Sequence, residues 1–243
     1  MERNTQHTPE TMPLSKYLAH AGICSRRNAT DVIKTGEILV NNKMAANPGV
    51  RISAADVVTY KGKTVKPESF VYLMLNKPPH IITVVTDPEG RPTVMAFLPK
   101  NVRQRVYPVG RLDRETTGLI LLTNDGDLAM RLSHPRFGVK KVYQAYLDRP
   151  ADLGHLDRMK RGMMLEDGMM RVDDVSPASQ DRRCIRVIVH SGKKRIVRRL
   201  FETFGYIVKK LERSCYGSLT KRGLALGEWR YLTKQEIARL KQK

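Results

Sequence analysis

Residues 107–127, YPVGRLDRETTGLILLTNDGD, place a polar loop directly before a continuous apolar run. The run Leu119–Leu122 predicts a buried strand. Asp113 lies in the loop before this strand, between Arg111 and Arg114. Such a loop holds a side chain rigidly and leaves it accessible, so Asp113 is a candidate catalytic residue. The residues alone also allow the alternative that Asp113 only forms a loop ion pair with the arginines.

Other short apolar runs, bounded by proline or glycine, predict strands at 71–75, 81–85, 142–147 and 184–189. Apolar residues at helical spacing predict helices near 126–132, 150–161, 195–204 and 233–242. Strands outnumber helices and do not alternate strictly with them, which favours an α+β fold class. We assign residues 70–243 to this sheet domain.

A smaller unit is predicted over residues 13–66, after a flexible tail of residues 1–12. Apolar residues at helical spacing predict a first helix over residues 14–21. Ser25 predicts the N-cap of a second helix, which ends at Gly36. A hairpin is expected to follow this helix pair.

The small unit carries candidate contacts to an anionic ligand. Arg26 and Arg27 are expected in the first turn of the second helix, where the helix dipole disfavours positive charge. A phosphate docked at that helix end would remove the conflict and use both guanidinium groups. Lys16 and Lys43, beside the hairpin turn at residues 41–42, add to the patch. The alternative is that these are solvated surface cations.

The charge of the whole chain indicates a polyanionic partner. The 243 residues carry 44 Lys and Arg against 24 Asp and Glu, a formal net charge of +20. Residues 191–213 alone carry eight basic and two acidic residues. Two separate basic regions fit a long ligand with regularly spaced phosphates. A membrane surface fits less well, because no basic segment carries a broad exposed apolar face.

The segment 191–204, SGKKRIVRRLFETF, predicts a helix with one apolar and one cationic face. Its density of positive charge favours phosphate contacts or an ion pair with a buried carboxylate over a merely solvated face. The cations proposed for phosphate contact in this segment are Lys193, Lys194, Arg195 and Arg199.

Several classes of protein are excluded or disfavoured. The sequence contains neither the G-x-x-x-x-G-K-[ST] pattern nor the G-x-G-x-x-G pattern of phosphate-binding glycine loops. Their absence argues against nucleotide hydrolysis and dinucleotide redox chemistry. Asp125 and Asp127 lack the further oxygen ligands of a calcium loop and fit a turn, so no metal and no cofactor are expected. Cys24, Cys184 and Cys215 are too few for a disulfide framework. With no secretory signal and no apolar run of about 18 residues, we expect a cytoplasmic protein.

Four segments together carry a family resemblance. Residues 110–132, GRLDRETTGLILLTNDGDLAMRL, resemble the signature of bacterial pseudouridine synthases of the RsuA type. Residues 72–94, 134–147 and 191–205 are similar to other segments of that family, in the same order. Residues 14–43 resemble the alpha-L RNA-binding motif of a small-subunit ribosomal protein. The amino-acid sequences of several segments resemble more closely those of the RluB-like branch of the family, which modifies large-subunit ribosomal RNA.

The resemblance implies roles for individual residues. Asp113 matches the essential aspartate, and Arg111 matches the residue that helps displace the target base from its stack. Tyr143 matches the aromatic residue that lies against the target uracil, and Arg198 matches the basic residue that pairs with the aspartate. One position departs from the family pattern, because His80 stands where glycine is usual. We expect that change to alter the local turn and not the reaction class.

The resemblance further implies a catalytic domain built on a mainly antiparallel mixed sheet with flanking helices. Its activity would be the isomerisation of a uridine to pseudouridine in ribosomal RNA, within a structured stem-loop and in free RNA or an assembling subunit. This reaction needs no cofactor. We expect a monomer that does not bind membranes. The alternatives are a non-catalytic ribosomal RNA-binding or ribosome-assembly protein and, less well supported, a nuclease or N-glycosidase.

Overall fold

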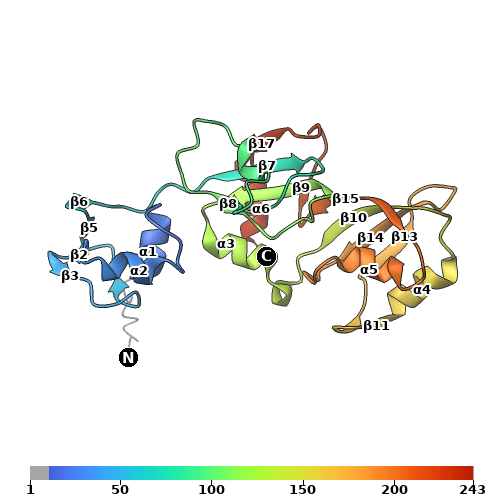
Figure 1. The fold of residues 1–243 in the computed structure, drawn as a ribbon, viewed down its shortest axis with the longest axis horizontal. Coiled ribbons are helices and arrows are strands. Elements are labelled where there is room, and N and C mark those ends of the chain that lie inside the picture. Colours follow the sequence, from blue (N-terminus) through green and yellow to red (C-terminus); the bar gives the residue numbers. More distant parts are fainter. Residues whose placement is uncertain (1–10, 243) are drawn as a thin grey trace, which may run out of the picture. The chain divides into compact units, whose positions relative to one another are not determined.

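The computed structural model describes residues 11–242 and divides into two compact units, residues 1–70 and 71–243 (Figure 1). The expected flexible tail lies outside the described residues except at its last two positions. There the expectation is wrong, because Met12 belongs to strand β1 (Met12–Pro13) and pairs with Ile52 of β4 (Arg51–Ile52). The side chain of Arg51 also donates to the Thr11 carbonyl at 2.8 Å, which fixes the chain before the first helix.

The first unit packs two helices on a small antiparallel sheet. The helices are α1 (Leu14–His20) and α2 (Ala29–Lys34). The sheet has the order β3-β2-β5-β6, with β2 (Ile38–Val40), β3 (Lys43–Met44), β5 (Val58–Tyr60) and β6 (Lys63–Thr64). Apolar side chains from both layers form one core, which includes Leu14, Leu18, Ala29, Ile38 and Val58. The predicted order of two helices and a hairpin is confirmed.

The second helix begins later than expected. Asn28, and not Ser25, is its N-cap residue, and the Ser25 hydroxyl instead accepts a hydrogen bond from the Asn28 amide at 3.1 Å. Arg26 and Arg27 therefore lie in the turn before α2 and are exposed to solvent. The argument that they occupy the first helical turn is wrong. Their proposed contact with RNA now depends on their exposure and charge alone.

The second unit is built on one mixed sheet with the order β13-β14-β10-β15-β9-β7-β17 (Figure 1). In chain order the strands of this path are β7 (Tyr72–Lys77), β9 (Thr117–Thr123), β10 (Lys141–Leu147), β13 (Asp174–Pro177), β14 (Cys184–Val189), β15 (Val208–Tyr216) and β17 (Trp229–Tyr231). Two short strands pair beside the path, β8 (Tyr107–Pro108) with β9 and β16 (Leu219–Thr220) with β15. All pairs are antiparallel except β9 with β15. The predicted α+β class with a mainly antiparallel mixed sheet is confirmed.

Strand β9 is buried along its whole length, because both faces of the sheet are covered. Leu119 and Leu121 pack in one core with helices α3 (Gly126–Ser133) and α6 (Lys234–Lys241). Ile120 and Leu122 pack in a second core on the opposite face. A third core joins α4 (Leu153–Arg161) and α5 (Ile196–Glu202) to strands β10 and β14. The loop before β9 is thus attached to a strand that is packed on both faces.

The strand predicted at 81–85 does not form. Only an isolated parallel bridge joins Ile82 to Thr93 there. Pro78 and Pro79 precede the segment and cannot donate the backbone hydrogen bonds of a ladder. The Thr83 hydroxyl is bonded to the loop that carries Asp113. The Ile82 amide donates to the Pro92 carbonyl and the Ile82 carbonyl accepts from the Val94 amide, both at 3.0 Å, so the backbone here bonds to residues 92–94 and not to a strand of the sheet.

Two further features bear on the class of protein. No helix within residues 11–242 is long and apolar enough to cross a membrane. The three cysteines are free thiols, as expected, and Cys24 is buried.

Candidate active site

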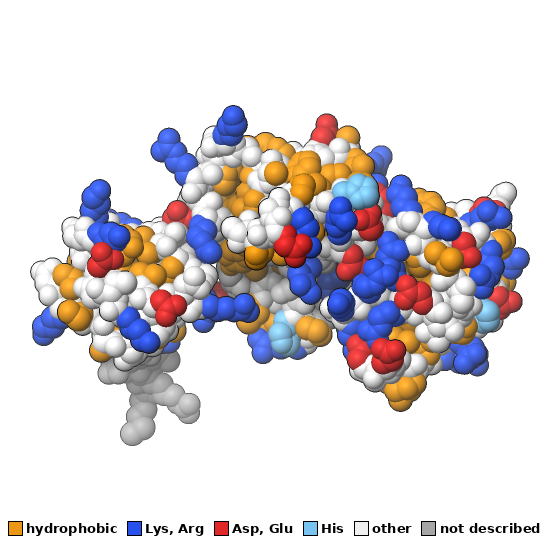
Figure 2. All heavy atoms as spheres, in the orientation of Figure 1, with side chains coloured by type: hydrophobic (Ala, Val, Ile, Leu, Met, Phe, Trp, Pro, Cys, Tyr) orange, Lys and Arg blue, Asp and Glu red, His pale blue; other side chains and the backbone are white. Residues whose placement is uncertain are grey.

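Most of the predicted site residues of the second unit meet in one cleft. The cleft has a volume of about 540 Å³ and lies between the loop before β9, the ends of β10 and β15, and the loop before α5. Lys and Arg side chains gather around the middle of this unit in Figure 2. Six of the residues singled out from the sequence line the cleft, namely Arg111, Asp113, Tyr143, Lys193, Lys194 and Arg195.

Thr83 holds the backbone next to Asp113 through two hydrogen bonds. The Thr83 hydroxyl donates to the Leu112 carbonyl at 2.9 Å and accepts from the Leu112 amide at 3.2 Å. The Leu112 side chain is buried in the core against β9. After it, the Thr116 amide donates to the Asp113 carbonyl at 3.0 Å and closes a tight turn. Asp113 is therefore half-buried on a loop fixed at both ends.

Lys77 fixes the same loop from the other side. Its side chain is completely buried, and its ammonium donates to the carbonyls of Pro78, Ile81 and Arg114 at 2.8, 2.8 and 3.1 Å. Burial lowers the pKa of Lys77 to about 8, although the nearby charges of Glu115 and Asp113 oppose this. The buried ammonium thus joins the end of β7 to the candidate catalytic loop, and its charge lies near that of Asp113.

His80 adopts the backbone conformation that glycine would adopt. Its φ is +66°, in the left-handed region that costs a non-glycine residue about 1–2 kcal/mol. The His80 Nδ1 lies 3.3 Å from a Glu115 carboxylate oxygen, so the two side chains are in contact. The departure from the family pattern leaves the turn in a glycine-like conformation, with a side-chain contact added.

We expect Thr83→Val to weaken the loop and the activity together. Valine matches threonine in shape but leaves the buried Leu112 amide and carbonyl without this partner. The free energy of unfolding should fall by about 1–3 kcal/mol. The rate of the reaction at Asp113 should fall about 10- to 100-fold, since small misplacements of reacting groups are costly. Urea denaturation and single-turnover kinetics measure both effects. Thr83→Ser keeps the hydroxyl and should retain most of the stability and most of the rate. A Thr83→Val variant with the wild-type rate would contradict the role assigned to Thr83.

Arg198 does not contact Asp113 in this structure. No hydrogen bond or ion pair joins the two side chains, both of which lie in the described part of the chain. The Arg198 guanidinium is buried and donates to the Val208 carbonyl at 2.6 Å, while its Nε has no hydrogen-bond partner. Burial lowers the pKa of Arg198, with Arg195 acting in the same direction and Asp113 opposing. The two groups therefore interact through space, and the expected direct pairing is absent.

Three residues at the floor of the cleft were not singled out from the sequence. Lys141, Arg213 and Tyr216 all line it and are only 6%, 2% and 1% exposed. Burial, together with the charge of Arg213, lowers the pKa of Lys141 to about 8. Burial also raises the pKa of Tyr216 to about 12, so its hydroxyl remains a hydrogen-bond donor at neutral pH. Lys141 precedes Tyr143 by two residues on one strand, so the two side chains share a face of the sheet. This spacing is the sequence signal that could have identified Lys141.

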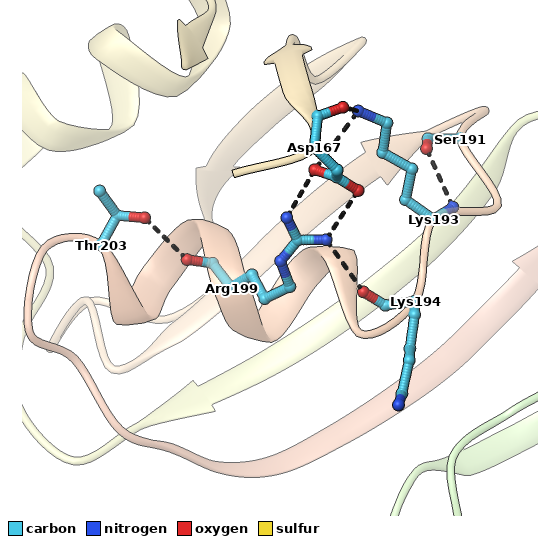
Figure 3. Close-up of polar contacts among 6 residues, drawn as sticks. All are labelled: Asp167, Ser191, Lys193, Lys194, Arg199 and Thr203. Carbon is cyan, nitrogen blue, oxygen red and sulfur yellow. Dashed lines mark hydrogen bonds and ion pairs between the residues drawn. The ribbon is translucent and has the colours of Figure 1, made fainter. Parts of the chain in front are cut away.

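Asp167 engages two of the cations predicted to contact RNA (Figure 3). It lies in the turn between β11 (Met163–Leu165) and β12 (Gly168–Met170). Its carboxylate accepts from both terminal nitrogens of Arg199, and its carbonyl accepts from the Lys193 ammonium at 2.8 Å. The hydrogen bonds from Arg199 lower the pKa of Asp167 to about 2. Arg199 does not line the cleft, and in this structure it anchors the hairpin.

Asp167→Asn should strengthen RNA binding by releasing these cations. With the negative charge removed, Arg199 loses its ion pair and Lys193 loses a 3.4 Å ion pair with the same carboxylate, so both become more available to phosphates, and each contact releases counterions. We expect log Kd to depend more steeply on log salt, with a slope larger by about 1–2. Filter binding across a salt series measures this slope. Asp157→Asn, which removes an exposed carboxylate on α4, is the matched control. A slope equal to that of the control would show that neither cation reaches the RNA.

The remaining candidates lie elsewhere. Lys16, Arg26, Arg27 and Lys43 belong to the first unit. Asp125 caps helix α3 by accepting from the Leu128 amide at 3.0 Å, as its predicted place in a turn suggests. Among residues 11–242 no group of His, Cys, Asp and Glu side chains has the arrangement of a metal site.

Comparisons with known families agree with the geometry. A family model described as RNA pseudouridylate synthase matches residues 71–203, and one described as S4 domain matches residues 12–58. The first match contains the loop of Asp113 and most of the cleft.

Individual relatives match along nearly the whole chain. The ribosomal large subunit pseudouridine synthase B of Bacillus subtilis (strain 168) is 40% identical over 232 residues, covering 94% of this chain and 95% of the relative. The dual-specificity RNA pseudouridine synthase RluF of Escherichia coli (strain K12) is 35% identical over 92% of this chain and 76% of its own. A crystal structure of a pseudouridylate synthase superposes with a TM-score of 0.67 at 27% identity, covering 94% of this chain and 99% of that one.

Proposed function

Because this chain belongs to the RNA pseudouridylate synthase family, we propose that it isomerises a specific uridine of large-subunit ribosomal RNA, with Asp113 as the catalytic residue. The observation that carries the proposal is the position of Asp113 in a cleft that also holds Tyr143 and a cluster of cations. The relative from Bacillus subtilis, named for the large ribosomal subunit, supports the choice of substrate.

The cleft offers the groups that such a reaction requires. The target base must leave its helix stack, which costs a few kcal/mol. Stacking of the uracil on Tyr143, worth about 1–3 kcal/mol, offsets much of this cost. Arg111 occupies the space of the displaced base, while Lys194 and Arg195, exposed at the cleft, bind the flanking phosphates. These contacts place the ribose of the flipped nucleotide beside the carboxylate of Asp113.

Asp113 then acts on the bond between the ribose and the base. The uracil detaches, turns, and rejoins the ribose through carbon, so the atoms of substrate and product are the same. The residues of the cleft hold the detached base during the turn. Arg198, close enough to interact with Asp113 through space, stabilises the charge of the carboxylate.

Residues 13–66 serve as the RNA anchor in this proposal, and residues 70–243 carry out the chemistry. The S4 domain match supports the first role, and Lys16, Arg26, Arg27 and Lys43 are its candidate contacts. We propose a structured stem-loop as the target, in free RNA or in an assembling subunit. The protein acts as a monomer in the cytoplasm, where ribosomal RNA is found.

Pseudouridine mapping of ribosomal RNA tests the proposal. Carbodiimide labelling and primer extension are applied to RNA from cells with and without the gene. We expect one reverse-transcription stop in large-subunit RNA to disappear, and the wild-type gene to restore it. A lost stop in small-subunit RNA would move the substrate to that subunit. An unchanged map in both subunits would contradict ribosomal RNA as the substrate and favour a non-catalytic RNA-binding role.

A further inference from the structure

We infer that Lys141, Arg213 and Tyr216 form a binding site at the cleft floor for an oxygen of the target uracil, which they hold while it carries negative charge. The inference rests on the proposed function and adds to it a second group of catalytic residues, on the sheet rather than on the loop of Asp113. The family motifs described in the sequence analysis assign no role in the reaction to these three residues.

A β-bulge brings the three side chains to one place. In the pairing of β10 with β15, Lys141 lies opposite Tyr216 and Tyr143 lies opposite Arg213. Ser214 is the extra residue on β15, where the register shifts. Without this bulge, Arg213 and Tyr216 would point to opposite faces of the sheet, because side chains alternate along a strand. With the bulge, the three side chains and that of Tyr143 all line the cleft.

The contacts of the two cations are with an aromatic ring and with neutral carbonyl oxygens, and the Asp173 carboxylate acts on Lys141 only from a distance. The Lys141 ammonium lies 5.7 Å from the centre of the Tyr216 ring, and the Arg213 guanidinium lies 4.6 Å from it. Lys141 donates to the His190 carbonyl at 3.1 Å, and Arg213 donates through Nε to the Leu119 carbonyl at 2.8 Å. Both acceptors are neutral.

Neither cation has a carboxylate partner within 4 Å among residues 11–242. Arg213 Nη2 is buried without any hydrogen-bond partner. The Tyr216 hydroxyl lies beside Gly110, at the start of the loop that carries Asp113, and makes no hydrogen bond within the same residues. Two buried positive charges without an anion in direct contact are costly, so this floor is complementary to a ligand oxygen with negative charge.

A flipped base, rather than a phosphate, is the part of the RNA that reaches this depth. The three side chains are more than nine-tenths buried, whereas Lys194 and Arg195 are exposed along the same cleft and suit the phosphates. A base rotated out of the helix enters such a pocket with its polar edge first. The floor group therefore faces an oxygen of the uracil.

The chemistry of the reaction places negative charge on that oxygen. When the bond between ribose C1′ and uracil N1 breaks, its electron pair stays with the base and spreads over N1, O2 and O4. A bond from C5 to C1′ then forms, the hydrogen of C5 leaves as a proton, and N1 takes up a proton. Donors aimed at the oxygen bind more strongly in the transition state than in the substrate, and this difference raises the rate.

The test compares Lys141→Met and Tyr216→Phe with Lys140→Met in the full-length protein. Lys140 is the exposed neighbour of Lys141 with the same charge, so it is the matched control. The probe is ribosomal RNA from cells that lack the gene. We expect Lys141→Met to lower the single-turnover rate at saturating enzyme by about 100-fold or more, and Tyr216→Phe by about tenfold. The Kd for RNA should change less than about threefold, and Lys140→Met should keep the wild-type rate.

Other results would overturn the inference. A lower affinity with a smaller salt dependence and an unchanged saturating rate would assign the floor to a phosphate. Equal rates for the wild type and both floor variants would show that the group does not act in the reaction. Tyr216→Phe keeps the ring that contacts both cations, so its folding is preserved even if Lys141→Met unfolds. A wild type without activity on this RNA would contradict the proposed function instead.

Discussion

Asp113→Asn is expected to abolish pseudouridine formation while RNA binding is retained. Asparagine keeps the size of the side chain and can still accept a hydrogen bond, but it can neither attack the ribose nor remove a proton from it. We expect the single-turnover rate to fall by at least about 10⁴-fold, as when a group that reacts directly with substrate is removed. The Kd for RNA should stay within about threefold of the wild-type value, since phosphate contacts dominate affinity.

A neighbouring carboxylate provides the control. Glu115 lies two residues further along the same loop, is exposed, and contacts His80 and Arg114. Glu115→Gln removes the same charge as Asp113→Asn, from nearly the same place, and should keep the wild-type rate. If both substitutions reduce the rate equally, Asp113 contributes only to the local electrostatic field. If Asp113→Asn also loses RNA affinity, the residue helps to bind the substrate and its catalytic role is unsupported.

The parts of the fold that local sequence determines were predictable. Asn41 and Asn42 both adopt a positive φ, as a tight hairpin turn requires, and the strands on either side pair as expected. Strand β9 was predictable because its apolar run is continuous. The segment 81–85 was not, because the Ile82 backbone bonds to Pro92 and Val94 and the Thr83 side chain bonds to Leu112, so this apolar run forms no strand. Local composition does not show which distant backbone will supply a partner.

The grouping of the candidate residues in one cleft was predictable where those residues follow one another in the chain. Asp113 and Arg111 share one loop, and Lys193, Lys194 and Arg195 share another, so sequence motifs found both groups. The floor of the cleft was missed because it depends on the pairing of β10 with β15 and on a bulge, which no local pattern predicts. Arg199 was identified as an RNA contact, but the structure shows it held by Asp167 from a hairpin 32 residues away.

Gly118→Ala is expected to destabilise the second unit severely. Gly118 is the residue of β9 that pairs with Arg213, and its φ of +103° is unfavourable for any residue with a side chain. A Cβ at this position would lie 2.8 Å from the Arg213 amide nitrogen and closer still to the Arg213 carbonyl oxygen. Both are backbone atoms of a central strand and cannot move aside. Conformational strain and overpacking together should lower the free energy of unfolding by about 3–5 kcal/mol.

Gly168→Ala separates these two causes. Gly168 has the same φ of +103°, but an added Cβ there would meet no atom within 4 Å. It should therefore show the conformational strain alone, about 1–3 kcal/mol. Urea denaturation gives both values, and the difference between them measures the contact of β9 with β15. Equal losses would mean that the two strands can separate at Arg213 without cost. The cleft floor would then not be rigid enough to hold a uracil oxygen, so this comparison of stabilities also bears on the chemistry.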